Sequence, residues 1–296
     1  MSDVITDAAT EFAPAKVNLT LRVGGPRADG YHPLDSLVVF ADWGDTLSAV
    51  PAERLTLSLT GPGAEGLKAD PQNLVLKAAY ALRAAADAPE LGASLTLDKH
   101  LPVAAGLGGG SSDAAAALRI LNRVWDLGFS IKQLAEIGSV VGADVPACVH
   151  ARPLRMEGIG ERVTPLIAWP GLHGVIVHPG APVPTGPVFK AYDATEPGRL
   201  SPGKAMIAGT LDDAIDRLLM DGNDLQAPAI IQAPVIQDAL DVIAAQPGVR
   251  LSRMSGSGAS CFGLFETSDA AQRAATSIAQ AHSEWTARAV VFGGAA

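Results

Sequence analysis

Apolar and polar residues alternate along much of the first third of the chain, a pattern typical of strands that bury one face. Gly, Pro and Asp residues, which favour turns, separate the alternating segments. The alternation predicts strands at Val17–Val23, Ser36–Phe40, Asp45–Val50, Arg54–Thr60 and Ser94–Leu101. Helical patterns with plausible caps predict helices over Asn73–Ala86, Ser112–Trp125 and Ser130–Val141.

The pattern changes after Arg162–Gly174, a stretch rich in Pro and Gly. Beyond it we expect strands, several helices and a final helix, in the order β-α-β-β-α-β. The segments that carry this order are Gly174–Gly180, Val249–Gly258, Ala259–Phe265, Ser268–His282 and Thr286–Phe292. The sequence therefore predicts an α+β protein of two domains, residues 1–165 and 166–296.

Composition narrows the class of protein. Hydrophobic residues make up 48% and charged residues 18% of the 296 residues, as in ordinary globular chains. The net charge is -9 and no basic run occurs, which argues against a nucleic-acid partner. No apolar run approaches the roughly 20 residues that span a bilayer, so we expect no membrane partner.

Compartment follows from the cysteines and the N-terminus. Cys148 and Cys261 are too few for a disulfide framework or a zinc cluster, and we interpret them as buried thiols in a reducing compartment. The opening MSDVITDAATEFAPAK lacks the positive charge and apolar core of a signal peptide. These features predict a cytoplasmic protein.

The most informative segment is LPVAAGLGGGSSDAAAAL, from Leu101 to Leu118. A strand, a glycine loop and a helix in succession aim free backbone N–H groups at one point, backed by the helix dipole. Glycine keeps Cβ atoms away from a bound anion and permits positive φ angles. Because a turn alone rarely needs Gly106, Gly108, Gly109 and Gly110 together, we interpret the loop as a phosphate cradle.

The register of this loop argues against two familiar cradles. A P-loop needs a lysine, and none occurs between Leu101 and Leu118. A dinucleotide loop read from Gly106 would place its last glycine on Ser111, and no βαβ series precedes it. An NAD-dependent oxidoreductase is thereby weakened, while a non-catalytic nucleotide-binding protein remains an alternative.

Four segments instead resemble the GHMP kinases, the galactose, homoserine, mevalonate and phosphomevalonate kinase superfamily. PVAAGLGGGSSDAA resembles its nucleotide loop and SRMSGSGASCFGLF its C-terminal glycine motif. PAKVNLTLRVGGPRADGYHPLDSL and GADVPACV resemble motifs of one branch, whose members phosphorylate a cytidyl diphosphate alcohol. The resemblance implies a ribosomal-protein-S5-like N-terminal domain and a ferredoxin-like C-terminal domain. Other members of the superfamily, such as homoserine or mevalonate-type kinases, are the alternative.

The resemblance also implies a nucleotide and its contacts. ATP would be the phosphoryl donor, with Mg2+ as its expected counterion, although the sequence identifies no metal ligands. The residues expected to bind ATP are Pro102, Val103, Ala104, Ala105, Gly106, Leu107, Gly108, Gly109, Gly110, Ser111 and Ser112. Asp113 follows where asparagine is also common, which adds a negative charge close to the phosphates.

Phosphoryl transfer to an alcohol needs a carboxylate for the proton and a cation beside the reacting groups. Asp144 lies between Gly142 and Pro146, where a fixed, irregular backbone is expected. The local sequence alone favours a loop or capping aspartate over a catalytic one. The resemblance makes Asp144 the base and Lys16 the catalytic lysine. Asn18, on the same strand face as Lys16, could hydrogen-bond the substrate or the pair.

Tyr31 and His32 follow Asp29–Gly30, which is a hairpin signal in its own right. An aromatic ring and an imidazole at a loop tip can stack on and hydrogen-bond a pyrimidine. The resemblance assigns both to a cytidine pocket closed by Phe189, so that the substrate contacts are Asn18, Tyr31, His32, Asp144 and Phe189.

Two further features complete the expectation. Gly256 and Gly258 in SGSG fit a tight turn between two strands, whereas the resemblance implies a support for the site. The chain departs from the family at HARPLRMEGIGE, where His150, Arg152 and Arg155 replace small residues. The partner is a small molecule, and the chain is expected to be a monomer or a homodimer.

Overall fold

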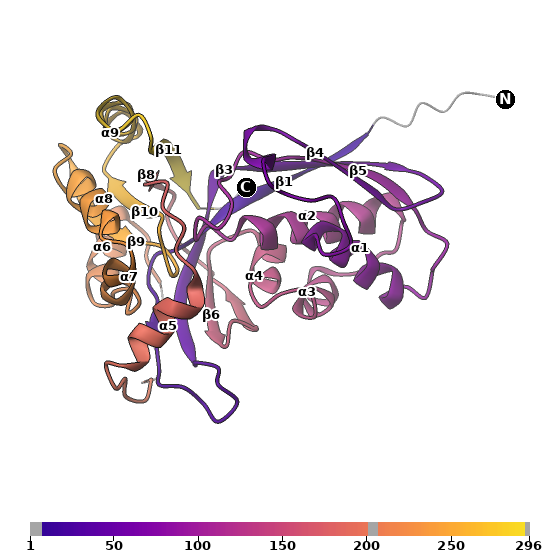
Figure 1. Cartoon of the computed structure of the whole chain (residues 1–296), viewed down its shortest axis with the longest axis horizontal. Coiled ribbons are helices and arrows are strands. Elements are labelled where there is room, and N and C mark those ends of the chain that lie inside the picture. The colour runs from indigo at the N-terminus through magenta and orange to yellow at the C-terminus, as the bar shows by residue number, and fades with distance from the viewer. Residues whose placement is uncertain (1–7, 201–206, 294–296) are drawn as a thin grey trace. The chain divides into compact units, whose positions relative to one another are not determined.

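The computed structural model describes residues 8–200 and 207–293 (Figure 1). Residues 1–7, which open the N-terminal stretch considered above, lie outside this range. The chain divides into two compact units that each combine several segments. The first comprises Met1–Ala15, Gly44–Val103 and Gly108–His150; the second comprises Lys16–Trp43, Ala104–Leu107 and Ala151–Ala296. The domain boundary at residue 165 stays a prediction.

The first unit combines strands with a group of helices (Figure 1). Strand β5 (Ala93–Asp98) pairs antiparallel with the end of β3 (Leu34–Pro51) and parallel with β4 (Thr56–Thr60). The helices are α1 (Leu74–Ala85), α2 (Gly109–Val124), α3 (Ile131–Ser139) and α4 (Val145–His150), preceded by the short 3-10 helix η1 (Pro62–Ala64).

Local sequence explains where these helices start and how they pack. Asn73 caps α1 by accepting from the N–H of Val75, and Ser130 forms a capping box with Gln133 at α3. In α2 the small residues Ala114–Ala117 are fully buried and allow α1 to pack closely against it. Both predicted caps are confirmed.

The second unit holds an antiparallel sheet in the order β11-β8-β10-β9 (Figure 1). Helix α8 lies against β9 and β10, and α9 against β8, β10 and β11. This is the predicted β-α-β-β-α-β arrangement, with the strand order of a ferredoxin-like fold. The bounds are β8 (Leu172–His178), α5 (Thr185–Asp193), α6 (Leu211–Leu219), α7 (Gln226–Gln232), α8 (Val235–Ala244), β9 (Val249–Met254), β10 (Cys261–Phe265), α9 (Ser268–Ala281) and β11 (Thr286–Phe292).

Short strands complete the second unit around the first half of β3. Strand β2 (Arg22–Val23) and strand β6 (Leu154–Gly158) both pair antiparallel with β3, and β7 (Arg162–Pro165) pairs with β6. Strand β1 (Ala9–Asn18) also pairs with β3. Both β1 and β3 run through the residues of both units.

Two predictions about strands were wrong, and two strands were missed. The strand expected over Val17–Val23 is interrupted, because β1 ends at Asn18 and β2 covers only Arg22–Val23. The strands expected on either side of Gly44 are one continuous strand, and the hairpin-like β6 and β7 were not predicted. Gly44 is needed for close packing rather than for a turn, since a Cβ there would lie 2.3 Å from the carbonyl oxygen of Ala13.

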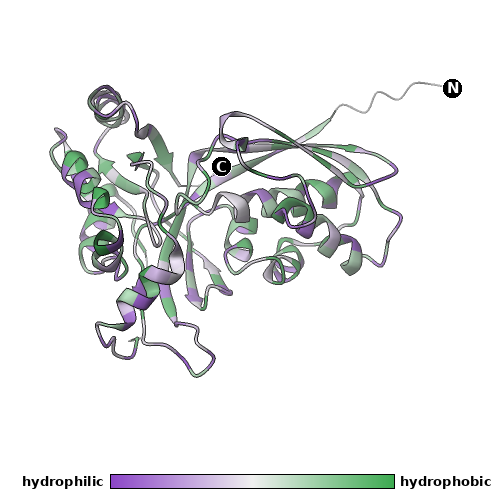
Figure 2. Ribbon diagram, in the orientation of Figure 1, coloured by the Kyte–Doolittle hydropathy of each residue, from purple (hydrophilic) through white to green (hydrophobic). Residues whose placement is uncertain are grey.

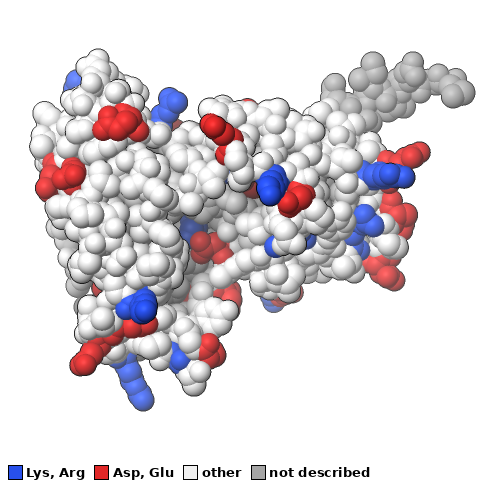
Figure 3. All heavy atoms as spheres, viewed as in Figure 1, with Lys and Arg blue, Asp and Glu red and all other residues white. Residues whose placement is uncertain are grey.

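The surface and core agree with the composition. Hydrophobic and hydrophilic residues alternate around the helices, as expected for helices that bury one side (Figure 2). Charged side chains of both signs are scattered over the face seen in Figure 3, with no broad basic field. Both cysteines are buried, as predicted, and neither forms a disulfide within the described residues. Within the described residues, no helix has the length and apolar character required to cross a membrane.

Candidate active site

The positive φ angles expected in the glycine loop occur at two of its four glycines. Gly106 and Gly108 have positive φ angles of 76° and 62°, and Ala104 has a φ of 56°. A Cβ on Gly106 would lie 2.5 Å from the carbonyl oxygen of Gly258, so this position requires glycine twice over. Gly109 and Gly110 are instead the first residues of α2, which begins three residues before the predicted start at Ser112.

The first turn of α2 is left without a side-chain cap. Its N-cap is Gly108, which offers no side-chain acceptor, whereas α1 and α3 in the same unit are capped by Asn73 and Ser130. The first N–H groups of a helix have no partner within the helix and carry the positive end of its dipole. An anion is the acceptor that this arrangement favours.

Strand β1 and the connection between β9 and β10 hold the loop by its carbonyl groups. The backbone N–H of Lys16 donates to Leu107 O at 2.8 Å, and that of Ser260 donates to Ala105 O at 3.2 Å. The Ser255 hydroxyl donates to Gly106 O at 3.4 Å. The SGSG segment thus contacts the loop through Ser255, and its role as a support for the site stays a prediction.

The two serines that follow the glycines differ in their surroundings. Ser112 is fully buried, and its hydroxyl donates to Pro14 O at 2.7 Å, which ties α2 to β1. Ser111 is half-buried. Of the two hydroxyls, that of Ser111 therefore fits a nucleotide contact better.

Lys16 and Asn18 lie on one face of β1, as their spacing predicts. Lys16 is only 4% exposed, and its Nζ donates to Asn18 Oδ1 at 3.3 Å. The Asn18 amide in turn donates to Ser36 Oγ at 2.7 Å. This chain of hydrogen bonds holds a buried cation in a defined direction.

Asp144 is half-buried and immediately precedes α4. Its carbonyl oxygen accepts from Cys148 N at 3.1 Å, so its backbone belongs to the start of that short helix. Asp144 belongs to the first unit and Lys16 to the second. Their action as a catalytic pair stays a prediction.

His32 and Phe189, predicted to share a pocket, are in contact in the second unit. Their ring centroids are 4.8 Å apart, with the planes tilted by 42°. His32 Nε2 lies 2.7 Å from Asp193 Oδ1, which fixes the ring. Asp193 was not predicted, because an aspartate at the end of α5 carries no signal in the sequence for this role.

Tyr31 stands at the exposed tip that precedes His32. Its side chain is 59% exposed, and its backbone N–H donates to Asp29 Oδ1 at 3.1 Å. Gly30 has a φ of 82°, so the predicted turn at Asp29–Gly30 is confirmed. The exposed ring is available for stacking.

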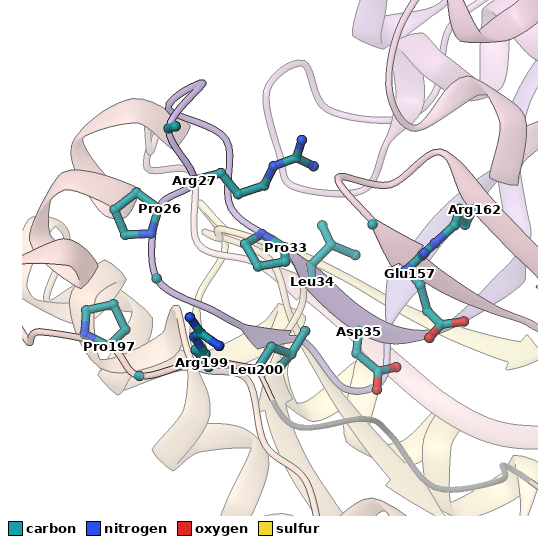
Figure 4. A pocket seen from close by; sticks show the side chains of 14 residues that line it. Pro26, Arg27, Pro33, Leu34, Asp35, Glu157, Arg162, Pro197, Arg199 and Leu200 are labelled. Atoms are coloured by element: carbon teal, nitrogen blue, oxygen red, sulfur yellow. The ribbon is translucent and has the colours of Figure 1, made fainter.

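A cavity of about 1000 Å3 lies beside Arg27, just before the Asp29–Gly30 turn (Figure 4). Arg27, Arg162 and Arg199 line it together with Asp35 and Glu157, and Figure 4 shows the three arginines on separate sides, with Glu157 beside Arg162. Proline and leucine side chains, from Pro26, Pro33, Leu34, Pro197 and Leu200, form the apolar part of its wall.

Arg155, in the segment that departs from the family pattern, has a buried partner. Its guanidinium donates to both carboxylate oxygens of Asp35, at 2.9 and 2.8 Å, and Arg22 lies 3.6 Å from the same carboxylate. These hydrogen bonds to Asp35 raise the pKa of Arg155. The departure therefore neutralises a buried acid beside the cavity.

Family models match both parts of the chain. The model for the GHMP kinase N-terminal domain matches residues 73–152, and that for the GHMP kinase C-terminal domain matches residues 205–284. A 4-diphosphocytidyl-2-C-methyl-D-erythritol kinase from Cereibacter sphaeroides is 50% identical over 93% of this chain and 95% of its own length. The chain belongs to the GHMP kinase family.

Another relative and two solved structures are also similar to this chain. A protein from Parvibaculum lavamentivorans with the same kinase name is 45% identical over 96% of this chain and 98% of its own length. The crystal structure of a 4-(cytidine 5'-diphospho)-2C-methyl-D-erythritol kinase matches with a TM-score of 0.78 and 34% identity, over 97% of this chain and 100% of that one. A homoserine kinase from Cytophaga hutchinsonii shares the fold at a TM-score of 0.73 and 18% identity, over 99% of this chain and 97% of that one.

Proposed function

We propose that this protein transfers the γ-phosphoryl group of ATP to the 2-hydroxyl of 4-diphosphocytidyl-2-C-methyl-D-erythritol, a step of the non-mevalonate route to isoprenoid precursors. The observation that carries the choice of substrate is His32, held by Asp193 and packed against Phe189. A fixed imidazole beside an aromatic ring suits a cytosine, which offers both a stacking face and hydrogen-bonding atoms. Relatives of the same kinase name support it over nearly the whole chain.

The nucleotide end of the proposal rests on the glycine loop. The triphosphate would accept hydrogen bonds from N–H groups at the uncapped start of α2. Ser111, in the first turn of this helix, would add a hydroxyl donor. Asp113 is committed to Lys99, which leaves its carboxylate out of this cradle. The charge on the phosphates would thus be met by backbone dipoles.

Mg2+ usually keeps one or two protein carboxylates and takes its other ligands from phosphates and water. In the described part of the chain, no group of three or more His, Cys, Asp or Glu residues could hold a metal ion. This suits an ion that arrives on ATP, and when bound it would neutralise charge on the phosphates. Ser111, half-buried in the first turn of α2, is the oxygen donor that we propose would hold it.

The chemistry at the acceptor would be done by Asp144 and Lys16. Asp144 would take the proton of the hydroxyl, and Lys16, oriented by Asn18, would stabilise negative charge on the attacking oxygen. Because phosphoryl transfer has a loose, anionic transition state, positioning and charge account for most of the catalysis.

The test measures ADP release with the cytidyl diphosphate alcohol, homoserine and mevalonate as acceptors. We expect turnover with the first only, loss of turnover by at least about 100-fold in Asp144→Asn, and ATP binding by that variant close to wild type in a calorimeter. Phe189→Leu should raise the KM of the cytidyl substrate with the KM of ATP unchanged. Activity on homoserine alone would overturn the proposal, and so would full activity of Asp144→Asn. A cytoplasmic location and a monomer or homodimer stay predictions.

A further inference from the structure

The first unit contains a buried group of charges that the proposed mechanism does not use. Lys99 Nζ donates to Asp113 Oδ2 at 2.8 Å and also to Asp45 Oδ2. The three side chains are at most 4% exposed. Asp45, Lys99 and Asp113 are called the buried trio below.

The buried trio joins the two ends of the glycine loop. Asp45 Oδ1 accepts from the backbone N–H groups of His100 and Leu101, at 2.5 and 2.8 Å, immediately before the loop begins. Asp113 lies one turn beyond Gly109, on the helix that follows the loop. Lys99 connects the two carboxylates, so the backbone before the loop and the helix after it share one cross-link.

Lys99 also lies directly against the start of α2. A Cβ on Gly109 would be 3.0 Å from Lys99 Nζ. The ammonium group therefore occupies the space beneath the turn whose N–H groups we assign to the nucleotide, and the glycine leaves room for it.

Burying three charged side chains is costly, and the protonation of each depends on its neighbours. Burial alone would lower the pKa of Lys99, but the attraction of Asp113 and Asp45 raises it, so the lysine stays charged. Asp113 Oδ1 is buried and, within the described residues, has no hydrogen-bond partner. Apolar side chains of similar size would fill this place without the cost of desolvation, so stability alone does not account for it.

We propose that Lys99 is a positioning residue for ATP, which acts through Asp45 and Asp113 to hold the glycine loop and the first turn of α2 in the geometry that binds phosphate. The inference rests on the proposed role of the loop. It assigns the trio no contact with substrate and no part in the chemical step. A loop free to move would bind ATP more weakly, because ordering it would oppose binding.

The test compares two substitutions at one position. Asp113→Asn keeps an oxygen that can accept from Lys99, whereas the isosteric Asp113→Leu removes the link to α2 and leaves the neutral Lys99–Asp45 pair. We expect the Leu variant to raise both the Kd of ATP, measured by calorimetry, and the KM of ATP about tenfold or more. The kcat at saturating ATP and the KM of the cytidyl substrate should change by less than about threefold, and the Asn variant should stay near wild type.

Lys99→Met/Asp113→Leu provides a second variant, in which only Asp45 remains, bound to two backbone N–H groups. It should show the same weakened ATP binding while its circular dichroism spectrum stays that of the wild type. If a folded Leu or double variant bound ATP as tightly as wild type, the trio would not position the loop. A wild-type protein that binds ATP without phosphorylating the cytidyl substrate would overturn the proposed function instead, and the calorimetric comparison would still decide this inference.

Discussion

At the scale of single residues, buried charged side chains are the feature from which we predict the largest effects on stability. Asp113 and Asp35 are both almost fully buried, and each depends on a cation that reaches it from a different segment. Removing one partner from such a pair leaves a desolvated charge, which costs more than the pair contributes. Substitutions in both pairs should therefore change the free energy of unfolding.

The first prediction concerns pH and Asp113. Burial raises the pKa of Asp113 from 3.8 to about 7, despite the opposing attraction of Lys99. The folded protein thus binds a proton that the unfolded chain has lost between pH 4 and 7, so this group stabilises the fold at low pH and its contribution is lost as pH rises through 7. Asp113→Asn should flatten this dependence, by at most about 1.4 kcal/mol per pH unit.

Denaturant titrations at several pH values between 5 and 8.5 measure this difference. Asp216→Asn, at an exposed position on α6, is the control and should give a curve parallel to that of the wild type. The prediction is wrong if the difference in unfolding free energy between wild type and Asp113→Asn is the same at pH 5 and pH 8.

The second prediction concerns Arg155. Arg155→Leu removes both hydrogen bonds to the buried Asp35 and should lower the free energy of unfolding by roughly 2 to 3 kcal/mol. Arg152→Leu, in the same segment but exposed, should change it by less than about 0.5 kcal/mol. Thermal and denaturant unfolding measure both variants. If Arg155→Leu and Arg152→Leu lower the free energy of unfolding equally, the Arg155–Asp35 pair contributes nothing specific to stability.

At the scale of elements, the glycine loop separates two reasons for glycine. Gly106 and Gly66 have nearly the same φ, 76° and 77°, but only at Gly106 would a Cβ meet another backbone atom within 4 Å. The two positions form a matched pair in which backbone strain is shared and close packing is not.

The third prediction uses this pair. Gly66→Ala should cost about 1 to 2 kcal/mol of stability from its backbone conformation alone and leave the KM of ATP unchanged. Gly106→Ala should cost more and raise the KM of ATP severalfold, because the loop must shift away from Gly258 O. Denaturation and steady-state kinetics on both variants provide the measurement. Unchanged ATP kinetics in Gly106→Ala would contradict the role given to the loop.

The elements also show how far the sequence alone can lead. Alternation and capping residues located α1, α3 and strands β8, β9, β10 and β11, because these signals are local. The single strand β3 was not predictable, since Gly44 fits a turn as well as a strand, and only its contact with Ala13 decides between them. Strands β6 and β7 are short, β6 directly follows Pro153 and β7 ends at Pro165, so their pattern is weak.

The candidate site was predicted where a motif carries its own chemistry, as in the glycine loop. Pairing His32 with Phe189 required the family resemblance, because no spacing in the sequence connects residues so far apart. Asp193 and the buried trio were missed altogether. Their side chains have ordinary surroundings in the sequence, and their roles depend on which buried neighbours the fold provides.

At the scale of the whole molecule, the chain combines a glycine loop that we propose to bind ATP with a His32–Phe189 ring contact that we propose to bind a pyrimidine. It does so within a family whose closely similar members share one kinase name. Similarity extends over nearly the full length of these relatives, so support for the proposed reaction comes from most of this chain rather than from one motif.

The most direct measurement is phosphorus NMR of the protein mixed with ATP, Mg2+ and 4-diphosphocytidyl-2-C-methyl-D-erythritol. The account predicts a new phosphate monoester resonance that grows together with ADP, and no such signal with Asp144→Asn. If the wild-type protein leaves this alcohol unchanged while it phosphorylates homoserine or mevalonate, the account is contradicted.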